Sequence, residues 1–154
     1  MKKIIIGSGI LILLDQIIKF IIRNTVVSSI SVIPHFFYIT YVKNKGAAFG
    51  ILSNQVILLI LVAVFLLGFL IYEVKKQKQE SKLFMITYSL IIGGLIGNLI
   101  DRVVLGYVTD YLEFYLGSYA FPVFNLADMA IVIGVILLII HEIRGEKNGV
   151  EDQR

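Results

Sequence analysis

The chain contains no cysteine and no tryptophan, and only two prolines and two histidines among its 154 residues. Without cysteine it can form no disulfide, no thiolate metal site and no cysteine nucleophile. The sequence also has no H-E-x-x-H zinc motif and no G-x-S-x-G nucleophile elbow. If the protein is a hydrolase, carboxylates are therefore the groups left to carry out the reaction.

Hydrophobic residues make up 58% of the chain, and the mean hydropathy is +0.89. Soluble domains contain roughly 45–50% apolar residues, and here the apolar residues form blocks long enough to span a bilayer as helices. We therefore predict one integral membrane domain over residues 1–154, all-α with a small β element. The four predicted transmembrane helices cover residues 4–22, 55–72, 83–100 and 124–140.

Positive charge predicts the orientation of these helices. The formal net charge is +3, and lysines cluster beside the apolar runs, at Lys2, Lys3, Lys75, Lys76, Lys78 and Lys82. The positive-inside rule places the short loop between the second and third helices, and both termini, in the cytoplasm. Segments 23–54 and 103–123 are then external, and the charged tail 141–154 is expected to be disordered. No basic helix face or aromatic–basic module indicates nucleic-acid binding.

The first external segment has a different composition from the helices. Its run 36–42 is β-branched and aromatic and too short to span a bilayer, which predicts a strand. Small residues at 44–50 would let backbone or substrate approach closely. A short external sheet on the membrane surface suits this segment, and an ordinary hairpin between two helices is the alternative.

The stretch from Asn98 to Asp128 places polar groups beside two long apolar runs. A charge at the centre of a membrane helix costs roughly 2.5–3.5 kcal/mol on insertion scales, so polar groups kept near such helices mark a candidate functional site. The acidic residues at or near the predicted outer face are Asp15, Asp101, Asp110, Glu113 and Asp128. The histidines, His35 and His141, are expected on opposite sides of the membrane, so they cannot share a metal.

Two of the five acids have local partners of opposite charge. Asp15 and Lys19 are one helical turn apart and can pair, either as a structural ion pair or as the lining of a polar cavity. Asp101 is followed by Arg102 and stands three residues after Asn98, which favours a structural role.

Asp110 and Asp128 have no lysine or arginine nearby in the sequence. Two such acids placed close together cannot both ionise easily, so one keeps a proton near neutral pH. The charged acid can then take a proton from water while the neutral one protonates the leaving amine. Simpler interpretations stay open. Asn125 can cap the last helix with Asp128 at its third position, and Asp110 and Glu113 can be solvated loop acids.

Five sequence boxes, in order and spacing, resemble those of the lipoprotein signal peptidases (signal peptidase II), which are bacterial membrane aspartyl peptidases. The boxes are DQIIK at 15–19, NKGAAFG at 44–50, GNLIDR at 97–102, VTD at 108–110 and FNLAD at 124–128. The resemblance implies an aspartic endopeptidase without metal or other cofactor. Such an enzyme removes the signal peptide from prolipoproteins by cleaving before a diacylglyceryl-modified cysteine.

The same resemblance implies a fold and a location. Four transmembrane helices would carry a small β-cradle on the outer leaflet, formed by the first external segment. The chain would be a monomeric, multi-pass protein of the bacterial plasma membrane, in contact with lipid, with its active site on the extracytoplasmic face.

Residue by residue, the resemblance matches Asp110 and Asp128 to the two catalytic aspartates. The positions that match residues contacting the substrate or supporting the pair are Asn44, Gly46, Asn98, Arg102 and Asn125. The positions that match mainly structural polar residues are Asp15, Lys19 and Asp101. Tyr111 stands where the family usually has phenylalanine, and its added hydroxyl could reach a polar neighbour or a lipid headgroup.

Two other classes of function fit the sequence less well than the peptidase. A small membrane transporter or assembly subunit would place acids at several depths, including the second helix, but the run 55–72 contains none. An intramembrane serine peptidase would need a motif that this sequence lacks. The aspartic peptidase is the function that we expect.

Overall fold

The computed structural model describes residues 1–47, 51–77 and 81–151, with side chains as far as residue 143. Its helices are α1 (Lys2–Thr25), α2 (Val56–Lys76), α3 (Lys82–Leu105) and α4 (Leu126–Glu151). Its strands are β1 (Ile30–Ile33), β2 (Phe37–Asn44), β3 (Val108–Leu116) and β4 (Tyr119–Ala120). Lys78, the end of the small-residue run at 48–50 and the tail at 152–154 lie outside the described residues.

In the part of the chain that the structure describes, four helices are long and apolar enough to cross a membrane, which confirms the prediction from hydropathy. The candidate spans are Lys2–Thr25, Val56–Lys76, Lys82–Leu105 and Leu126–Ile143. Large apolar side chains point away from the bundle, for example Ile57 and Phe65, which are 75% and 73% exposed. Such an outward-facing apolar surface is stable in lipid and costly in water.

The last helix is longer than predicted, because α4 continues to Glu151. The expected disorder of the tail 141–154 is therefore wrong as far as residue 151. The sequence HEIRGEKNGVE contains no proline, and several of its charged residues are good helix formers. A helix already formed in the preceding span is extended at little cost, since the unfavourable step is nucleation.

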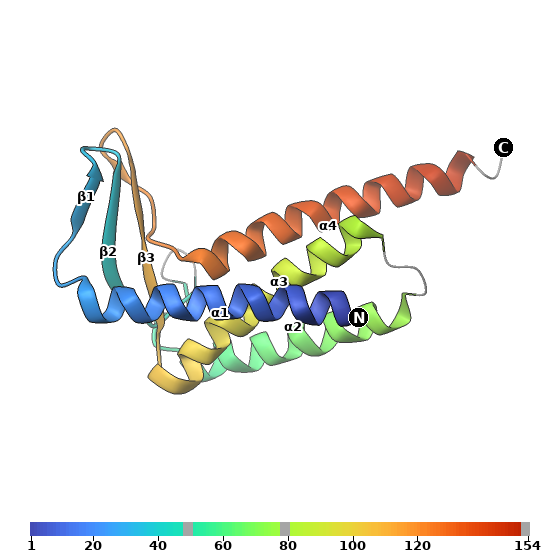
Figure 1. The fold of residues 1–154 in the computed structure, drawn as a ribbon, viewed down its shortest axis with the longest axis horizontal. Coiled ribbons are helices and arrows are strands. Elements are labelled where there is room, and N and C mark those ends of the chain that lie inside the picture. The colour runs from blue at the N-terminus through green and yellow to red at the C-terminus, as the bar shows by residue number, and fades with distance from the viewer. Residues whose placement is uncertain (48–50, 78–80, 152–154) are drawn as a thin grey trace.

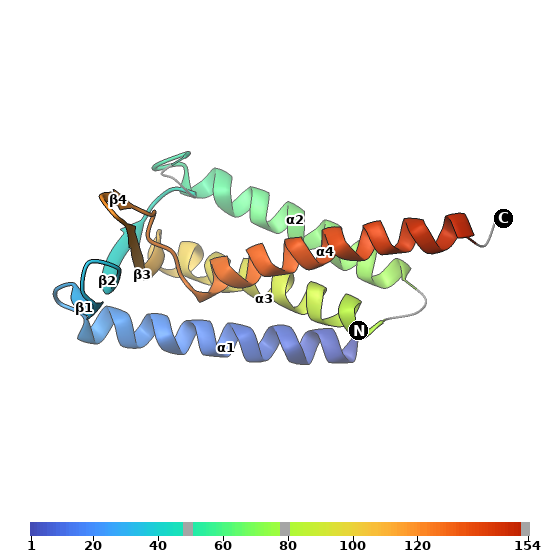
Figure 2. The same ribbon diagram turned by 90° about the horizontal axis from the view of Figure 1, so that it is seen from above.

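Helix α3 lies at the centre of the bundle and contacts each of the other three helices. Figure 2 shows α1 and α2 on opposite sides, with α3 and α4 between them. Glycines permit this close packing, as the sequence predicted for α3. A Cβ added at Gly97 would lie 2.6 Å from Asp15 Oδ2, and one added at Gly94 would lie 2.5 Å from the carbonyl oxygen of Ala127.

The four strands form one antiparallel sheet in the order β1-β2-β3-β4. The sheet lies at one end of the helix bundle, and the start of α1 and the end of α4 lie towards the other end (Figure 1). β2 confirms the strand predicted at 36–42. The prediction that the first external segment alone forms the sheet is wrong, because β3 and β4 come from the second segment.

β3 was not predicted as a strand because it carries two acids within the run VTDYLEFYL. Its other residues are mostly β-branched or aromatic, which favours a strand, and it pairs with β2 over most of its length. An isolated bridge between Leu112 and Phe124 then places the start of α4 directly beside β3. This junction of sheet and bundle is where the polar residues gather.

Candidate active site

Asp110 and Asp128 reach this junction from different elements. Asp110 lies on β3, where it pairs across the sheet with Val42 of β2. It is only 1% exposed, so the interpretation of Asp110 as a solvated loop acid is wrong. Asp128 is the third residue of α4 and is half-buried. Glu113, the other acid of this segment, also lies on the strand rather than in a loop, and it accepts a hydrogen bond from the Tyr115 hydroxyl at 2.9 Å.

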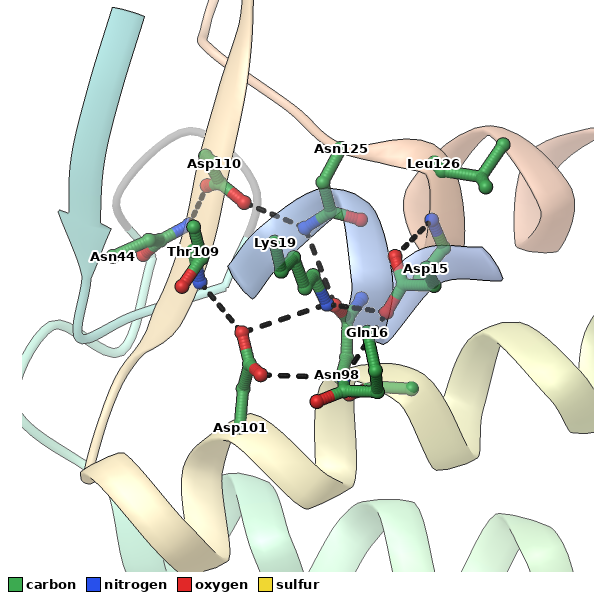
Figure 3. A network of polar contacts seen from close by, with 12 residues as sticks. Asp15, Gln16, Lys19, Asn44, Asn98, Asp101, Thr109, Asp110, Asn125 and Leu126 are labelled. Carbon is green, nitrogen blue, oxygen red and sulfur yellow. Dashed lines mark hydrogen bonds and ion pairs between the residues drawn. The ribbon is translucent and has the colours of Figure 1, made fainter. Parts of the chain in front are cut away.

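Three asparagines supply a hydrogen-bond donor to each oxygen atom of the two carboxyl groups. Asp110 accepts from Asn44 Nδ2 at 2.8 Å and from Asn125 Nδ2 at 2.7 Å, on separate oxygens (Figure 3). Asp128 accepts from Asn98 Nδ2 at 2.7 Å and from the backbone N–H of Asn125 at 3.2 Å. Asn125 therefore binds both acids, and through it the two carboxyl groups belong to one network.

Asn125 is also the cap of α4, as the sequence predicted. Its Oδ1 accepts from the backbone N–H of Asp128 at 2.9 Å, while the Asp128 carboxylate accepts from the backbone N–H of Asn125. This reciprocal arrangement is a capping box with an aspartate in the third position. The cap role and the contact with Asp110 coexist because Asn125 uses its carbonyl for one and its amide for the other.

A buried lysine orients the side chain of Asn98. Lys19 is 0% exposed, and its Nζ donates to Asn98 Oδ1 at 2.8 Å. The same oxygen accepts from Asn125 Nδ2 at 3.2 Å, so the Asn98 amide nitrogen is directed towards Asp128. The ion pair that the sequence predicted between Asp15 and Lys19 is present, with 2.8 Å between Oδ2 and Nζ (Figure 3).

Asp101 connects the helices to the sheet. Its carboxylate lies 3.6 Å from Lys19 Nζ and 3.5 Å from Arg23 Nη1. It also accepts from the backbone N–H of Thr109 at 2.8 Å, which ties α3 to the residue just before Asp110. Its cationic partners thus come from α1 rather than from the neighbouring Arg102.

Gln16, Arg23 and Thr109 were not recognised from the sequence. Gln16 Nε2 lies within 3.3 Å of carboxylate oxygens of Asp15 and Asp101, and Arg23 donates to Thr109 Oγ1 at 3.2 Å. A signal was present, because Asp15, Gln16, Lys19 and Arg23 have the spacing of one helix face. A polar stripe along an otherwise apolar span indicates a buried polar surface.

The remaining predicted residues, Gly46 and Arg102, contact each other. Arg102 Nη2 donates to the carbonyl oxygen of Gly46 at 3.1 Å, and the N–H of Gly46 donates to Asn44 Oδ1 at 2.8 Å. Asn44 is thereby held with its amide nitrogen towards Asp110. A side chain at position 46 would approach within 2.9 Å of the carbonyl oxygen of Ile51, so glycine is required for this close turn.

Burial raises the pKa of Asp110 to about 7, and the negative charge of Asp128 contributes in the same direction. The hydrogen bonds from Asn44 and Asn125 oppose this shift, since they favour the charged form. A carboxyl group with such a pKa exchanges its proton near neutral pH. The site therefore holds two carboxyl groups in one network, one of them suited to proton transfer.

No cluster of three or more histidine, aspartate or glutamate side chains suited to holding a metal occurs in the part of the chain that the structure describes. What the geometry offers instead is a pair of carboxyl groups oriented by amides. Such a pair can supply a general base and a general acid to one reaction.

The chain matches known proteins over nearly its whole length. The family model described as "Signal peptidase (SPase) II" matches residues 8–144. A "Lipoprotein signal peptidase" from Haemophilus influenzae is 38% identical over 153 residues, which cover 96% of this chain and 89% of that protein. A "Lipoprotein signal peptidase" from Staphylococcus aureus is 38% identical over 159 residues, which cover 99% of this chain and 98% of that protein.

Solved structures show the same fold. A structure entitled "Bacterial membrane enzyme structure by the in meso method at 2.3 A resolution" aligns with a TM-score of 0.87 at 37% identity, covering 96% of this chain and 92% of that one. A second structure, with the same wording at 1.9 A resolution, gives a TM-score of 0.81 at 38% identity and covers 92% of each chain.

Proposed function

Because the chain belongs to the signal peptidase II family, it is a membrane peptidase that removes the signal peptide from prolipoproteins, and we propose that Asp110 and Asp128 hydrolyse the peptide bond. The observation that carries this proposal is the network in which Asn44, Asn98 and Asn125 supply donors to all four carboxyl oxygens. The rival interpretation as a transporter is not favoured, since the family is one of peptidases.

The proposed reaction uses the pair with one proton between its two members. The charged carboxylate takes a proton from a water molecule, whose oxygen attacks the carbonyl carbon of the scissile bond. The neutral carboxyl group gives its proton to the nitrogen of the departing amine as the C–N bond breaks. The products are a carboxylic acid and an amine. The base has gained one proton and the acid has lost one, so after the products leave the pair again holds a single proton.

The fixed amides give this pair a constant geometry. Asp110 is held on a paired strand and Asp128 on the first turn of a long helix, and both are joined by Asn125. A pre-oriented acid and base lower the entropic part of the barrier. Since Asp110 is buried and Asp128 half-buried, we place the attacking water nearer to Asp128.

We further propose that cleavage occurs before a cysteine that carries a diacylglyceryl group. On β3, Asp110, Leu112 and Phe114 share one face, because alternate strand residues point the same way. Phe114 stacks on Phe37 with 4.6 Å between ring centroids, and on Phe124 at 5.8 Å. This apolar face leads from the acids to the sheet tip and suits a substrate that brings acyl chains with it.

The proposed location is the bacterial plasma membrane, with the sheet and the two acids on the extracytoplasmic face. Lys2, Lys3, Lys75, Lys76 and Lys82 lie at helix ends away from the sheet. Short basic segments of this kind remain in the cytoplasm. We propose that the chain works there as one peptidase domain and as a monomer.

The substrate is tested with two peptides that differ only in the modified residue. We expect purified enzyme in lipid nanodiscs to cleave a prolipoprotein peptide whose cysteine carries diacylglycerol, and to leave the matched peptide with serine at that position intact. Mass spectrometry should place the cut immediately before the modified cysteine, and a chelator should not reduce the rate. Equal cleavage of the serine peptide, or loss of activity in chelator, would contradict the proposal.

The proposal that the acid pair works with one proton between its two members is tested by the pH dependence of kcat. Asp110 has a pKa of about 7, so as the pH rises through that value the pair loses its proton donor and kcat should fall. At low pH the second carboxyl group is protonated too, which removes the base and completes a bell-shaped profile.

One variant should shift the fall in kcat at high pH, the alkaline limb of the profile, in a known direction. The hydrogen bond from Asn44 lowers the pKa of Asp110, so Asn44→Ala should raise that pKa and shift the limb to higher pH. The measurement is kcat for the lipid-modified peptide at saturating substrate, from about pH 5 to about pH 9. A flat profile in the wild type, or a limb that moves to lower pH in the variant, would contradict the assignment.

A further inference from the structure

The first backbone N–H groups of α4 find partners in two other elements, α1 and β3, and in the cap of α4 itself. The initial N–H groups of a helix have no partner within it. Here Ala127 donates to Asp15 Oδ1 of α1 at 3.2 Å, and Asp128 donates to its own cap Asn125. The N–H of Leu126 donates to the hydroxyl of Tyr111, on β3, at 3.1 Å. The start of the helix that carries Asp128 is therefore held from both α1 and the sheet.

Tyr111 is itself firmly held and can therefore fix the start of α4. The residue is 5% exposed and belongs to the same hydrophobic cluster as Ile22 of α1 and Val26, which directly follows that helix. Its own backbone N–H donates to the carbonyl oxygen of Phe124 at 3.0 Å. Tyr111 thus binds the segment leading into α4 at two points. Its backbone N–H bonds to Phe124, and its phenol hydroxyl bonds to Leu126.

We propose that the Tyr111 hydroxyl is a positioning group that sets the separation of Asp110 and Asp128, an inference that rests on the proposed function of these two acids. Tyr111 directly follows Asp110 in β3, and its hydroxyl holds the residue two positions before Asp128. The length of the rigid Tyr111 side chain therefore helps to fix the distance between the two carboxyl groups.

The hydroxyl keeps the same state throughout the working range of the enzyme. Burial raises the pKa of Tyr111 to about 12, so the phenol stays neutral when the acids titrate. Tyr111 points to the face of β3 opposite Asp110, because successive strand residues alternate. Removing its hydroxyl should therefore change the placement of Asp128 without removing any donor to Asp110.

The first test replaces Tyr111 with phenylalanine and measures kcat and KM separately for the lipid-modified peptide. Loss of the hydroxyl leaves the Leu126 N–H without its acceptor, and α4 can shift to find another. We expect kcat to fall about fivefold, close to the ~1 kcal/mol that a net hydrogen bond contributes, while KM stays unchanged. The pH of the alkaline limb should also move, since the acids repel each other according to their separation.

Tyr41→Phe is the matched control. Tyr41 lies on β2, packs against the same hydrophobic cluster, and its hydroxyl bonds to the Tyr107 hydroxyl at 2.8 Å rather than to α4. Loss of one phenolic hydroxyl from the sheet should then leave kcat and the pH profile unchanged. If Tyr41→Phe and Tyr111→Phe lower kcat and thermal stability alike, the hydroxyl acts only on the stability of the sheet and the proposal is overturned.

A second variant removes the same hydrogen bond from its other side. Leu126→Pro deletes the donating N–H at the first helical position, where proline is well tolerated. If the two groups act through one bond, the double variant Tyr111→Phe, Leu126→Pro should have a kcat no lower than the Leu126→Pro variant alone. Strictly multiplicative losses in kcat would overturn the proposal.

Asp110→Asn, assayed in parallel, distinguishes failure of the proposed acid pair from failure of the positioning role of Tyr111. If Asp110→Asn is inactive while Tyr111→Phe has a wild-type kcat and pH profile, the positioning role is refuted and the acid pair stands. If Asp110→Asn retains wild-type turnover, the acid pair itself is refuted. Failure of Tyr111→Phe to fold would make the hydroxyl a folding determinant and would likewise overturn the positioning role.

Discussion

Replacing either Asp110 or Asp128 with asparagine is expected to reduce kcat for the lipid-modified peptide by about 10²–10⁴-fold, the range typical of a lost general acid or base. Asparagine has nearly the same shape but can neither accept nor release the required proton. At position 128 its carbonyl oxygen can still cap the N–H of Asn125, so α4 should keep its start. KM should change little, because the loss falls on the chemical step.

Glu113→Gln provides the matched control for these variants. Glu113 lies on the same strand as Asp110, but three residues further along and so on the opposite face. Its contact is with the Tyr115 hydroxyl at 2.9 Å, outside the network of asparagines. The variant should therefore turn over at a rate close to wild type. Substantial turnover by Asp110→Asn or Asp128→Asn would exclude the pair as the catalytic machinery.

A measurement of the thermal stability of Asp110→Asn tests whether its expected inactivity arises from unfolding. The folded-state pKa of Asp110, about 7, lies above that of an aspartate in an unfolded chain, about 3.9. Its contribution to stability is therefore complete below the unfolded pKa and is lost as the pH rises through about 7. Asparagine does not ionise, so above that pH the variant should melt at least as high as wild type.

Replacing Lys19 with methionine is expected to destabilise the fold by about 3–5 kcal/mol, as is typical when one partner is removed from a buried ion pair. Lys19 is 0% exposed and lies 2.8 Å from Asp15 and 3.6 Å from Asp101. Its loss leaves both carboxylates with less positive charge in a site that excludes water. Activity should fall as well, because Asn98 loses the donor that fixes its amide towards Asp128.

The double variant Lys19→Met, Asp15→Asn tests the cause of that destabilisation. Neutralising Asp15 removes one of the uncompensated charges, and asparagine can still accept the N–H of Ala127 that Asp15 accepts. The double variant should therefore be more stable than Lys19→Met alone, as measured by unfolding in mixed detergent micelles. Lys43→Met, at an exposed lysine of the sheet, should have little effect. A double variant less stable than the single one would show that lost packing, rather than charge, is responsible.

Local sequence patterns predicted some features of the site correctly. The spacing of Asp15 and Lys19 predicted their ion pair, since residues four apart on a helix lie on one face. The order of Asn125 and Asp128 predicted the helix cap, since a capping box depends on only four consecutive residues. Long apolar runs predicted the four spans, because bilayer thickness sets the number of residues required.

Other predictions failed where a distant segment decided the outcome. Asp110 looked like a solvated loop acid because strand formation by β3 depends on pairing with β2, more than sixty residues earlier. In the folded protein the two segments are adjacent because α2 and α3, which lie between them in the sequence, return the chain to the same end of the bundle. Gln16 and Arg23 were missed because their partners, Asp101 and Thr109, lie on α3 and β3.

The sequence by itself determined the membrane spans, the family and the identity of the two proposed catalytic acids. These depend on local hydrophobicity and on motifs read in order along the chain. Only the tertiary structure decided that three asparagines orient both acids, that Lys19 supports them from behind, and that Tyr111 ties β3 to α4. The reason is physical: hydrogen bonds and burial depend on separation in space, and these contacts join α1, α3, β2, β3 and α4, which are far apart in the sequence.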